Sequence, residues 1–365
     1  MRQILRNPGS QGHELWSPSE TRRSRHRGFV RSRYNDQTTS GQFLAKSVNE
    51  SRYCARVGVN ITRPRRHLVG VLLAAALVAI TATACSNGNG PTLGRPTTPP
   101  LTVSAANAKT QFAPAGSATI TPGVQTYTGD GQCTTNFVFV DSDGNVYVGQ
   151  AAHCSGTGSD TETNGCQNNS LPIGTAVTFN KGGNPITGEG TKLGGGTLVY
   201  NSWLTMHQRG ETDLATCSFN DLALIRVNSE DISKVNPSIP FWGGPTGLDT
   251  DGTTAGAKIY SYGSSSLKFG WKALSKQHGT SKADQPDNDG WSHTVVMHFP
   301  GIPGDSGSAY LDSQGRALGV LSTIGLALPP VNAIGDITHE LRYARANSGI
   351  DGLQLVLSTA PFTGD

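Results

Sequence analysis

The chain has 365 residues, 35% of them hydrophobic, and a formal net charge of +3, which is long enough for one large β domain or two small ones. The charge is unevenly distributed, because residues 1–85 hold fourteen Lys and Arg against four acids and the remaining residues hold fifteen against twenty-two. The basic run at 22–27 has no aromatic platform or folded module beside it, so nucleic-acid binding is not expected.

The first part of the chain has the features of an export signal. A basic stretch at 63–67 precedes an apolar run at 68–80, which is too short to span a bilayer comfortably. We therefore predict a signal peptide at 57–84. Because such signals normally begin a chain, residues 1–56 are expected to be an untranslated stretch, from a start codon assigned too early, or a disordered leader.

The residues after the apolar run fit two processing routes. Ala82 and Ala84 match a small-x-small signal-peptidase site, whereas Cys85 directly after them has the position of the lipid-modified cysteine of a bacterial lipoprotein. We favour lipidation of Cys85, which places the protein at the cell surface; cleavage without lipidation would release it from the cell. Residues 85–118, with Asn-Gly and Pro-Thr strings, are predicted to be a flexible linker.

From Thr119 onward the chain changes to short β-rich runs separated by Gly, Asn and Asp, which predicts an all-β domain over 119–358. The predicted strands lie at 136–140, 146–149, 176–180, 196–200, 222–227, 258–262, 294–299, 308–311 and 317–322. The string from Asp141 to Asn145 predicts a hairpin turn.

The second half of this domain contains two further features. The polar stretch 264–291 is predicted to be a solvated surface loop, and a calcium site on Asp284, Asp287 and Asp289 is the alternative. One helix is predicted at 338–346, with Asp336 or Thr338 as its cap, and helix elsewhere is expected to be scarce.

Three short strings carry the candidate chemistry. His153 follows Ala151-Ala152, Asp221 precedes an apolar strand, and Ser306 lies in Gly304-Asp305-Ser306-Gly307-Ser308. A serine hydroxyl becomes a good nucleophile when an imidazole takes its proton, and the imidazole needs a carboxylate to hold its other nitrogen. Taken singly, the serine string is also typical of a polar turn, the histidine of a buried or metal-bound residue, and the aspartate of a strand cap. Together, in the order His, Asp, Ser, they favour catalysis.

On these strings the chain, from about residue 120 to 358, resembles secreted bacterial serine proteases of the trypsin and chymotrypsin kind. The resemblance implies an all-β fold of two antiparallel six-stranded barrels with the active site between them and a short C-terminal helix. It also implies that His153, Asp221 and Ser306 form the catalytic triad, and that the N–H groups of Gly304 and Ser306 form the oxyanion hole. We see no Ile-Val-Gly-Gly-like string before Cys133, so activation by a freed N-terminus pairing with Asp305 is not expected.

By the same resemblance, Pro300, Ser322, Thr323 and Ile324 are the candidate substrate-binding residues. Pro300 stands where enzymes that cleave after Arg or Lys carry an acid, so cleavage after small or medium apolar residues is expected. The alternative is that a loop insertion brings an acid such as Asp284 or Asp336 to the floor of the pocket.

Four of the six cysteines lie in the exported domain, and an even number outside the cell predicts two disulfides. Four cysteines allow three pairings. The resemblance implies that Cys133 pairs with Cys154, which leaves Cys166 with Cys217. A zinc site is the alternative, but the spacings lack the close cysteine pairs that zinc modules use.

Two functional hypotheses follow. The favoured one is a secreted or lipid-anchored serine endopeptidase that acts on polypeptides through an acyl-enzyme on Ser306, is a monomer and needs no metal or organic cofactor. In this hypothesis the only link to a membrane is a lipid on Cys85. The rival is a catalytically weak homologue that serves as a binding module at the cell surface, because a fold alone does not separate the two.

Overall fold

The computed structural model describes residues 103–104, 110–158, 164–284, 288–325 and 330–364. The predicted leader, the signal peptide, Cys85 and most of the linker lie outside these described residues. Within the described ranges, no helix has the length and apolar character needed to cross a membrane.

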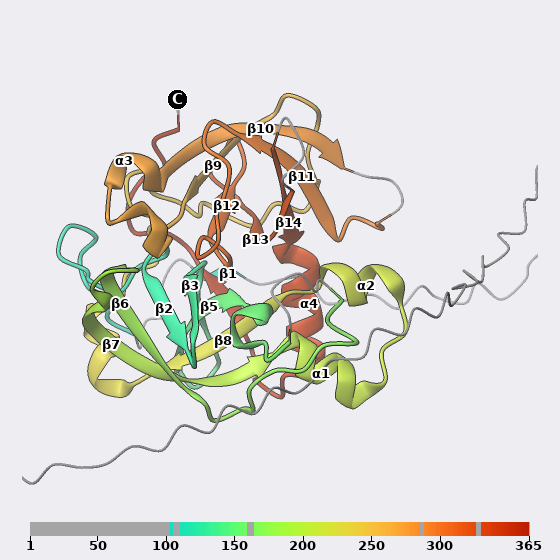
Figure 1. Cartoon of the computed structure of the whole chain (residues 1–365), viewed down its shortest axis with the longest axis horizontal. Helices are drawn as coiled ribbons and strands as arrows, with labels where there is room; N and C mark the ends of the chain where they lie inside the picture. Colours follow the sequence, from blue (N-terminus) through green and yellow to red (C-terminus); the bar gives the residue numbers. More distant parts are fainter. Residues whose placement is uncertain (1–102, 105–109, 159–163, 285–287, 326–329, 365) are drawn as a thin grey trace, which may run out of the picture. The chain divides into compact units, whose positions relative to one another are not determined.

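The first lobe is a nine-stranded sheet with the strand order β1-β15-β4-β5-β8-β7-β6-β2-β3 (Figure 1). Its strands are antiparallel except for the pair β1 and β15. They are β1 (Val103–Ser104), β2 (Gln125–Thr128), β3 (Gly131–Thr134), β4 (Val138–Val140), β5 (Val146–Ala151), β6 (Ala176–Asn184), β7 (Gly188–Asn201), β8 (Leu222–Val227) and β15 (Gln354–Val356).

The second lobe is a closed barrel of six antiparallel strands, drawn in orange and red in Figure 1, with the order β10-β11-β14-β13-β12-β9. The strands are β9 (Lys258–Tyr262), β10 (Lys276–Asp284), β11 (Ser292–Met297), β12 (Ala309–Leu311), β13 (Ala317–Gly325) and β14 (Val331–Asp336). The all-β fold with two lobes is therefore the predicted one, and this barrel has the predicted number of strands.

The first lobe has more strands than the six that were predicted. After the last helix the chain returns to this lobe, where β15 pairs with β4 through Gln354 and Val140, and β1 adds to the far side of β15. These pairings join segments that lie far apart in the sequence. A local hydrophobic pattern shows that a strand forms and does not show which remote strand it joins.

Among the described residues, four α-helices accompany the strands: α1 (Ser202–Arg209), α2 (Leu214–Phe219), α3 (Lys272–Ser275) and α4 (Ile337–Asn347). The predicted C-terminal helix is α4, whose N-cap is Asp336; its carboxylate accepts from the His339 N–H at 2.8 Å. The helices α1 and α2 were not predicted individually. Both are short and capped by side chains, Asn201 and Asp213, which satisfy the first free N–H groups.

The prediction of a solvated loop over 264–291 was wrong. This stretch contains the short 3-10 helix η3 (Ser266–Lys268), α3 and β10, which lies between β9 and β11 in the barrel. The pattern was missed because β10 places polar residues, Gln277 and Ser281, at buried positions. The alternative was a calcium site on Asp284, Asp287 and Asp289. In the structure the Asp284 carboxylate accepts hydrogen bonds from Thr253 and His293, and Asp287 lies outside the described residues.

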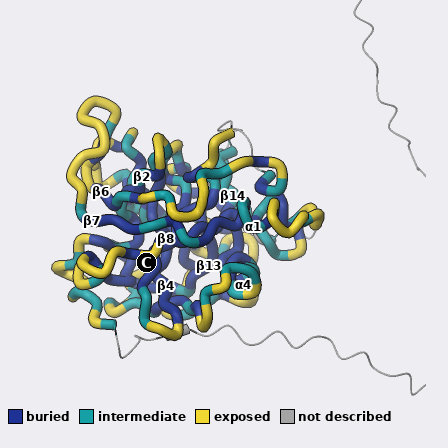
Figure 2. The backbone as a smooth tube through the Cα atoms, turned by 90° about the horizontal axis from the view of Figure 1, so that it is seen from below, coloured by how far each residue is buried: buried dark blue, intermediate teal, exposed yellow. Residues whose placement is uncertain are grey.

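Apolar side chains hold the two lobes together. One buried cluster joins Phe139 of the first lobe to Tyr260 and Leu311 of the barrel and to Leu341 of α4. Further clusters fill the first lobe and the barrel separately. Figure 2 shows the strands as mostly buried and the tip of the β6–β7 hairpin as exposed. Because the two lobes share this buried cluster, their relative position is fixed where they meet, and so are the side chains there.

A buried histidine ties the barrel to the start of α4. His293 on β11 is 1% exposed; its Nδ1 lies 2.5 Å from Asp284 Oδ1 and its Nε2 lies 2.9 Å from Asp336 Oδ2. Burial by itself lowers the pKa of His293, but the hydrogen bonds and charges of Asp336 and Asp284 outweigh it and raise the pKa above its usual value. The imidazolium form therefore donates to both carboxylates.

This arrangement predicts a pH dependence of stability. Because folding raises the pKa of His293, its contribution is fully present below the unfolded pKa and is lost as the pH rises through the folded pKa. A tenfold difference in proton affinity between the folded and the unfolded protein corresponds to about 1.4 kcal/mol. Urea unfolding from pH 6 to pH 9 is expected to show a larger loss of unfolding free energy for the wild type than for His293→Gln. Parallel curves for the two proteins would contradict the assignment.

Candidate active site

His153 and Asp221 meet because their strands are neighbours. β5 ends at Ala151, where the short 3-10 helix η1 (Ala152–Ser155) begins, and β8 begins directly after Asp221. The two strands pair with Ala151 opposite Leu222. As a result, His153 Nδ1 lies 2.7 Å from Asp221 Oδ2, and the His153 N–H donates to Asp221 Oδ1 at 2.9 Å.

The carboxylate of Asp221 is buried and receives a third donor. Ser322 Oγ on β13 donates to Asp221 Oδ2 at 2.6 Å. Ser322 is one of the candidate substrate-binding residues, and its hydroxyl is directed to the carboxylate beside the histidine. Three hydrogen bonds from two lobes thus fix the orientation of Asp221, and this carboxylate in turn holds the imidazole.

Ser306 lies on a tight loop that is held against the first lobe. The Ser306 carbonyl oxygen accepts from the Thr134 N–H at 2.8 Å, and the Gly304 carbonyl oxygen accepts from Thr134 Oγ1 at 2.8 Å and from Gln132 Nε2 at 3.1 Å. A Cβ atom at Gly307 would lie 2.5 Å from the Thr134 carbonyl oxygen and 2.8 Å from Ala151 N. Only a glycine permits this close approach to the strand end that leads into His153.

The same loop leaves two backbone donors available. Gly304 has φ +92°, a conformation that L side chains rarely adopt. Within the described residues, neither the Gly304 N–H nor the Ser306 N–H donates to a protein acceptor. Two unengaged N–H groups beside a serine are what a developing oxyanion requires.

A buried ion pair supports this loop. Lys268 Nζ lies 2.9 Å from Asp305 Oδ2, and the exposed fractions of the two side chains are 4% and 1%. The Asp305 carboxylate also accepts from the N–H groups of Ser265 and Ile302. Burial lowers the pKa of Lys268, and the charge of Asp305 opposes that effect. An internal cation thus neutralises the acid next to the candidate nucleophile.

Sequence reasoning missed Lys268 and its role. Four lysines lie in the stretch 264–291, and no local pattern distinguishes Lys268 from the exposed Lys272 and Lys282. The partner of Lys268 comes from another segment, so the signal is present only in three dimensions. A second residue that was missed, Glu340, accepts from the Asp221 N–H.

Two disulfides lie in the first lobe. Cys133 is bonded to Cys154, beside His153, and Cys166 is bonded to Cys217, the pairings that the resemblance implied. His153 and the sulfurs of Cys133 and Cys154 form the one group of potential metal ligands found among the described residues. Both sulfurs of that group are oxidised to the disulfide, whereas a cysteine binds zinc as a thiolate.

The candidate substrate-binding residues lie on two adjoining segments. Pro300 precedes Gly301, whose N–H donates to Asn332 Oδ1, and Thr323 and Ile324 lie on β13, half-buried. β12 pairs with β13 as far as Val320, and the described residues contribute no further strand on that edge. A free strand edge of this kind is suited to pair with an extended peptide.

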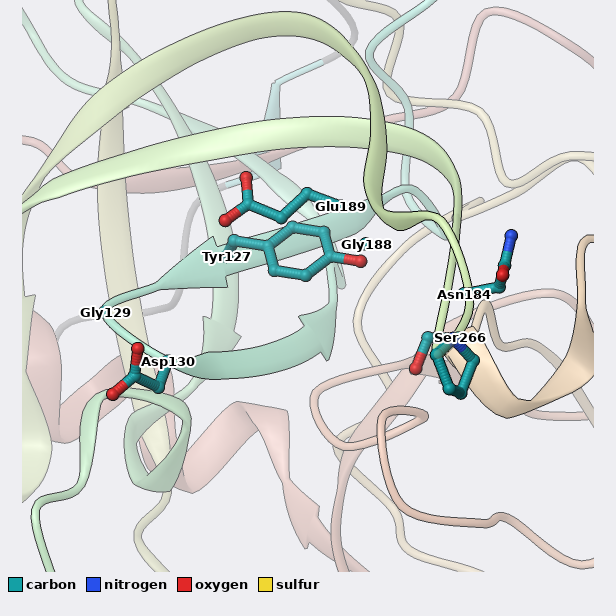
Figure 3. Close-up of a pocket in the computed structure, with 8 residues that line it drawn as sticks. Tyr127, Gly129, Asp130, Asn184, Gly188, Glu189 and Ser266 are labelled. Carbon is teal, nitrogen blue, oxygen red and sulfur yellow. The ribbon is translucent and has the colours of Figure 1, made fainter. Parts of the chain in front are cut away.

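A cavity of about 300 Å³ lies between the β2–β3 turn and the β6–β7 hairpin (Figure 3). It is lined by Tyr127, Gly129, Asp130, Asn184, Pro185, Gly188, Glu189 and Ser266. The Ser266 N–H donates to Gln132 Oε1, and Gln132 also donates to Gly304, so the cavity adjoins the candidate oxyanion loop. The residues that line this cavity include the carboxylates of Asp130 and Glu189 and no Lys or Arg. The cavity therefore favours ligand groups that are positively charged or donate hydrogen bonds.

No protein-family model matches the chain, and no curated protein matches it. Solved structures do. Thermobifida fusca Protease A is 17% identical with a TM-score of 0.39, and the match covers 65% of this chain and 98% of that one. Nocardiopsis Protease is 16% identical, with a TM-score of 0.38 and coverage of 65% and 98%. Cellulomonas bogoriensis chymotrypsin is 16% identical, with a TM-score of 0.37 and coverage of 65% and 97%. The matches cover nearly the whole length of these three proteins, which are named as two proteases and a chymotrypsin.

Proposed function

We propose that the protein is a serine endopeptidase that cleaves polypeptides through an acyl-enzyme on Ser306. The observation that carries the proposal is that the Ser306 loop lies against the end of β5, directly before His153 and its hydrogen bond to Asp221, and is bonded there to Thr134 at the end of β3. A Ser, a His held by a carboxylate, and two available N–H donors make up the parts that acyl transfer requires.

In the proposed mechanism, Ser306 Oγ attacks the carbonyl carbon of the scissile peptide bond while His153 accepts its proton. The N–H groups of Gly304 and Ser306 stabilise the charge that develops on the carbonyl oxygen. His153 then gives the proton to the leaving amine, and the acyl group remains as an ester on Ser306. Water, deprotonated by His153, hydrolyses the ester. Asp221 stabilises the imidazolium throughout.

The rival hypothesis, a binding module without catalysis, predicts a different outcome for one experiment. A fluorophosphonate reacts only with a serine whose proton is taken up by a neighbouring base. In oxidised protein we expect a single adduct on Ser306, together with cleavage of denatured protein substrates. Absence of the adduct, with both disulfides intact, would favour the binding module.

The side chain before the cut is predicted to be small or medium and apolar. Pro300, Thr323 and Ile324 supply no charge, and the two acids considered as an alternative floor, Asp284 and Asp336, both bind His293. A cation buried there without a partner would cost several kcal/mol. Chromogenic peptides ending in Ala, Leu, Phe and Arg are expected to be cleaved with Arg as the poorest. A tenfold preference for Arg would overturn the prediction.

Export and anchoring form a further part of the proposal. The two disulfides agree with an oxidising environment outside the cytoplasm. A lipid on Cys85, with the chain between Cys85 and β1 as a linker, would hold the peptidase domain at the cell surface. The substrates would then be polypeptides outside the cell.

A further inference from the structure

A buried glutamate lies behind the candidate catalytic aspartate. Glu340 on α4 is 0% exposed, and its Oε1 accepts from the Asp221 N–H at 3.0 Å. The Asp221 carbonyl oxygen accepts from the Ala152 N–H at 2.8 Å. The backbone of Asp221 is therefore held on both sides, by α4 through Glu340 and by η1 through Ala152.

The surroundings of Glu340 contain no compensating cation. Glu340 forms no ion pair with any described residue, and its second oxygen, Oε2, has no hydrogen-bond partner among them. The nearby charged groups are the acids Asp221 and Asp336, and the buried phenol of Tyr200 interacts with Glu340. Asp336 is bound to His293 and His339.

The fold makes room for this carboxyl group. A Cβ atom at Gly335 would lie 2.5 Å from Glu340 Oε1 and 2.9 Å from the Phe219 carbonyl oxygen. Any larger residue at 335 would displace the carboxyl group from the Asp221 N–H.

Burial and charge determine which form Glu340 takes. Burial in an apolar environment, together with the negative charges of Asp221 and Asp336, raises the pKa of Glu340 well above its usual range, and the Asp221 N–H bond only partly opposes this. A buried carboxyl group with no cation beside it and two acids nearby is favoured in its neutral form.

We propose that Glu340 is a positioning residue that fixes Asp221 toward His153 as a neutral carboxylic acid. This inference rests on the proposed peptidase function. A neutral acid accepts the Asp221 N–H bond without adding a second negative charge beside the His153–Asp221 pair. Asp221 then remains the anion that holds the orientation of His153.

The test compares Glu340→Gln with Glu340→Leu in the oxidised full domain. Glutamine keeps an uncharged acceptor for the Asp221 N–H, so kcat per titrated active site is expected to stay within threefold of wild type. Leucine removes the acceptor, and a displaced Asp221 is expected to lower kcat by about 10- to 100-fold at unchanged KM. The pKa of His153, read by NMR of its imidazole, is expected to be unchanged in the first variant and lowered in the second.

Two outcomes would overturn the proposal. Equal kcat per titrated site and equal His153 pKa in Glu340→Leu and wild type would show that Glu340 only supports the fold. A lowered His153 pKa in Glu340→Gln would show that Glu340 is an anion. Glu230→Leu, at an exposed position in the short 3-10 helix η2 (Ser229–Lys234) after β8, is the matched control and is expected to change neither value.

Two further measurements keep the test decisive. If Glu340→Leu does not fold, Gly335→Ala tests the same contact. Independently of that variant, a carboxylic-acid C=O band that is present in the infrared spectrum of wild type and absent from that of Glu340→Gln reports the neutral form directly. If wild type neither reacts with fluorophosphonate nor cleaves peptides, the proposed function fails, while the NMR and infrared results still decide the state of Glu340.

Discussion

Replacing Ser306 by alanine is expected to lower kcat by about a million-fold, and replacing His153 by alanine to cost about as much. The serine supplies the oxygen that forms the acyl-enzyme, and without the imidazole its proton has no acceptor. The measurement is hydrolysis of a chromogenic peptide under single-turnover conditions. Contaminating protease in each variant preparation is inactivated beforehand by titration with an irreversible inhibitor.

The two variants have matched controls. Ser229→Ala and His207→Ala change exposed residues away from the site and are expected to retain full activity. All four proteins should unfold at similar denaturant concentrations, because Ser306 and His153 are not in the apolar clusters. More than a few per cent of wild-type activity in both active-site variants would refute the assignment of these residues to catalysis.

Replacing Lys268 by methionine is expected to destabilise the domain by about 3–5 kcal/mol and to abolish activity. The change leaves the buried Asp305 carboxylate without its cation, next to Ser306. Since Asp305 also receives the N–H groups of Ser265 and Ile302, its movement would displace the loop that presents Gly304 and Ser306. Urea unfolding and peptide hydrolysis measure the two effects.

An ion pair with an exposed lysine provides the comparison. Lys234 Nζ lies 2.7 Å from Asp231 Oδ1, but the lysine side chain is 44% exposed, so Lys234→Met is expected to cost at most about 1 kcal/mol. The double variant Lys268→Met with Asp305→Asn removes both buried charges and is expected to recover part of the stability. Equal losses for Lys268→Met and Lys234→Met would show that the Lys268 pair does not support the loop.

The sequence alone indicated the elements whose signals are local. Short β-rich runs marked β8, β9 and β13, because runs of apolar and β-branched residues between turn residues are typical of strands. The hairpin turn at Asp141 was readable because its signal is also local: the Asp141 carboxylate accepts hydrogen bonds from the nearby N–H groups of Asp143 and Asn145. The candidate triad was readable because its three residues lie in short strings, and its catalytic role stays a prediction.

Other features were decided by the tertiary structure. The return of β15 to the first lobe, the Lys268–Asp305 ion pair, the Ser322 hydroxyl on Asp221 and the burial of Glu340 each join residues far apart in the chain. A lysine or a glutamate has the same appearance in a sequence whether it is solvated or buried. What distinguishes the two cases is the cost of removing the charge from water, and that cost is set by the groups that the fold brings to it.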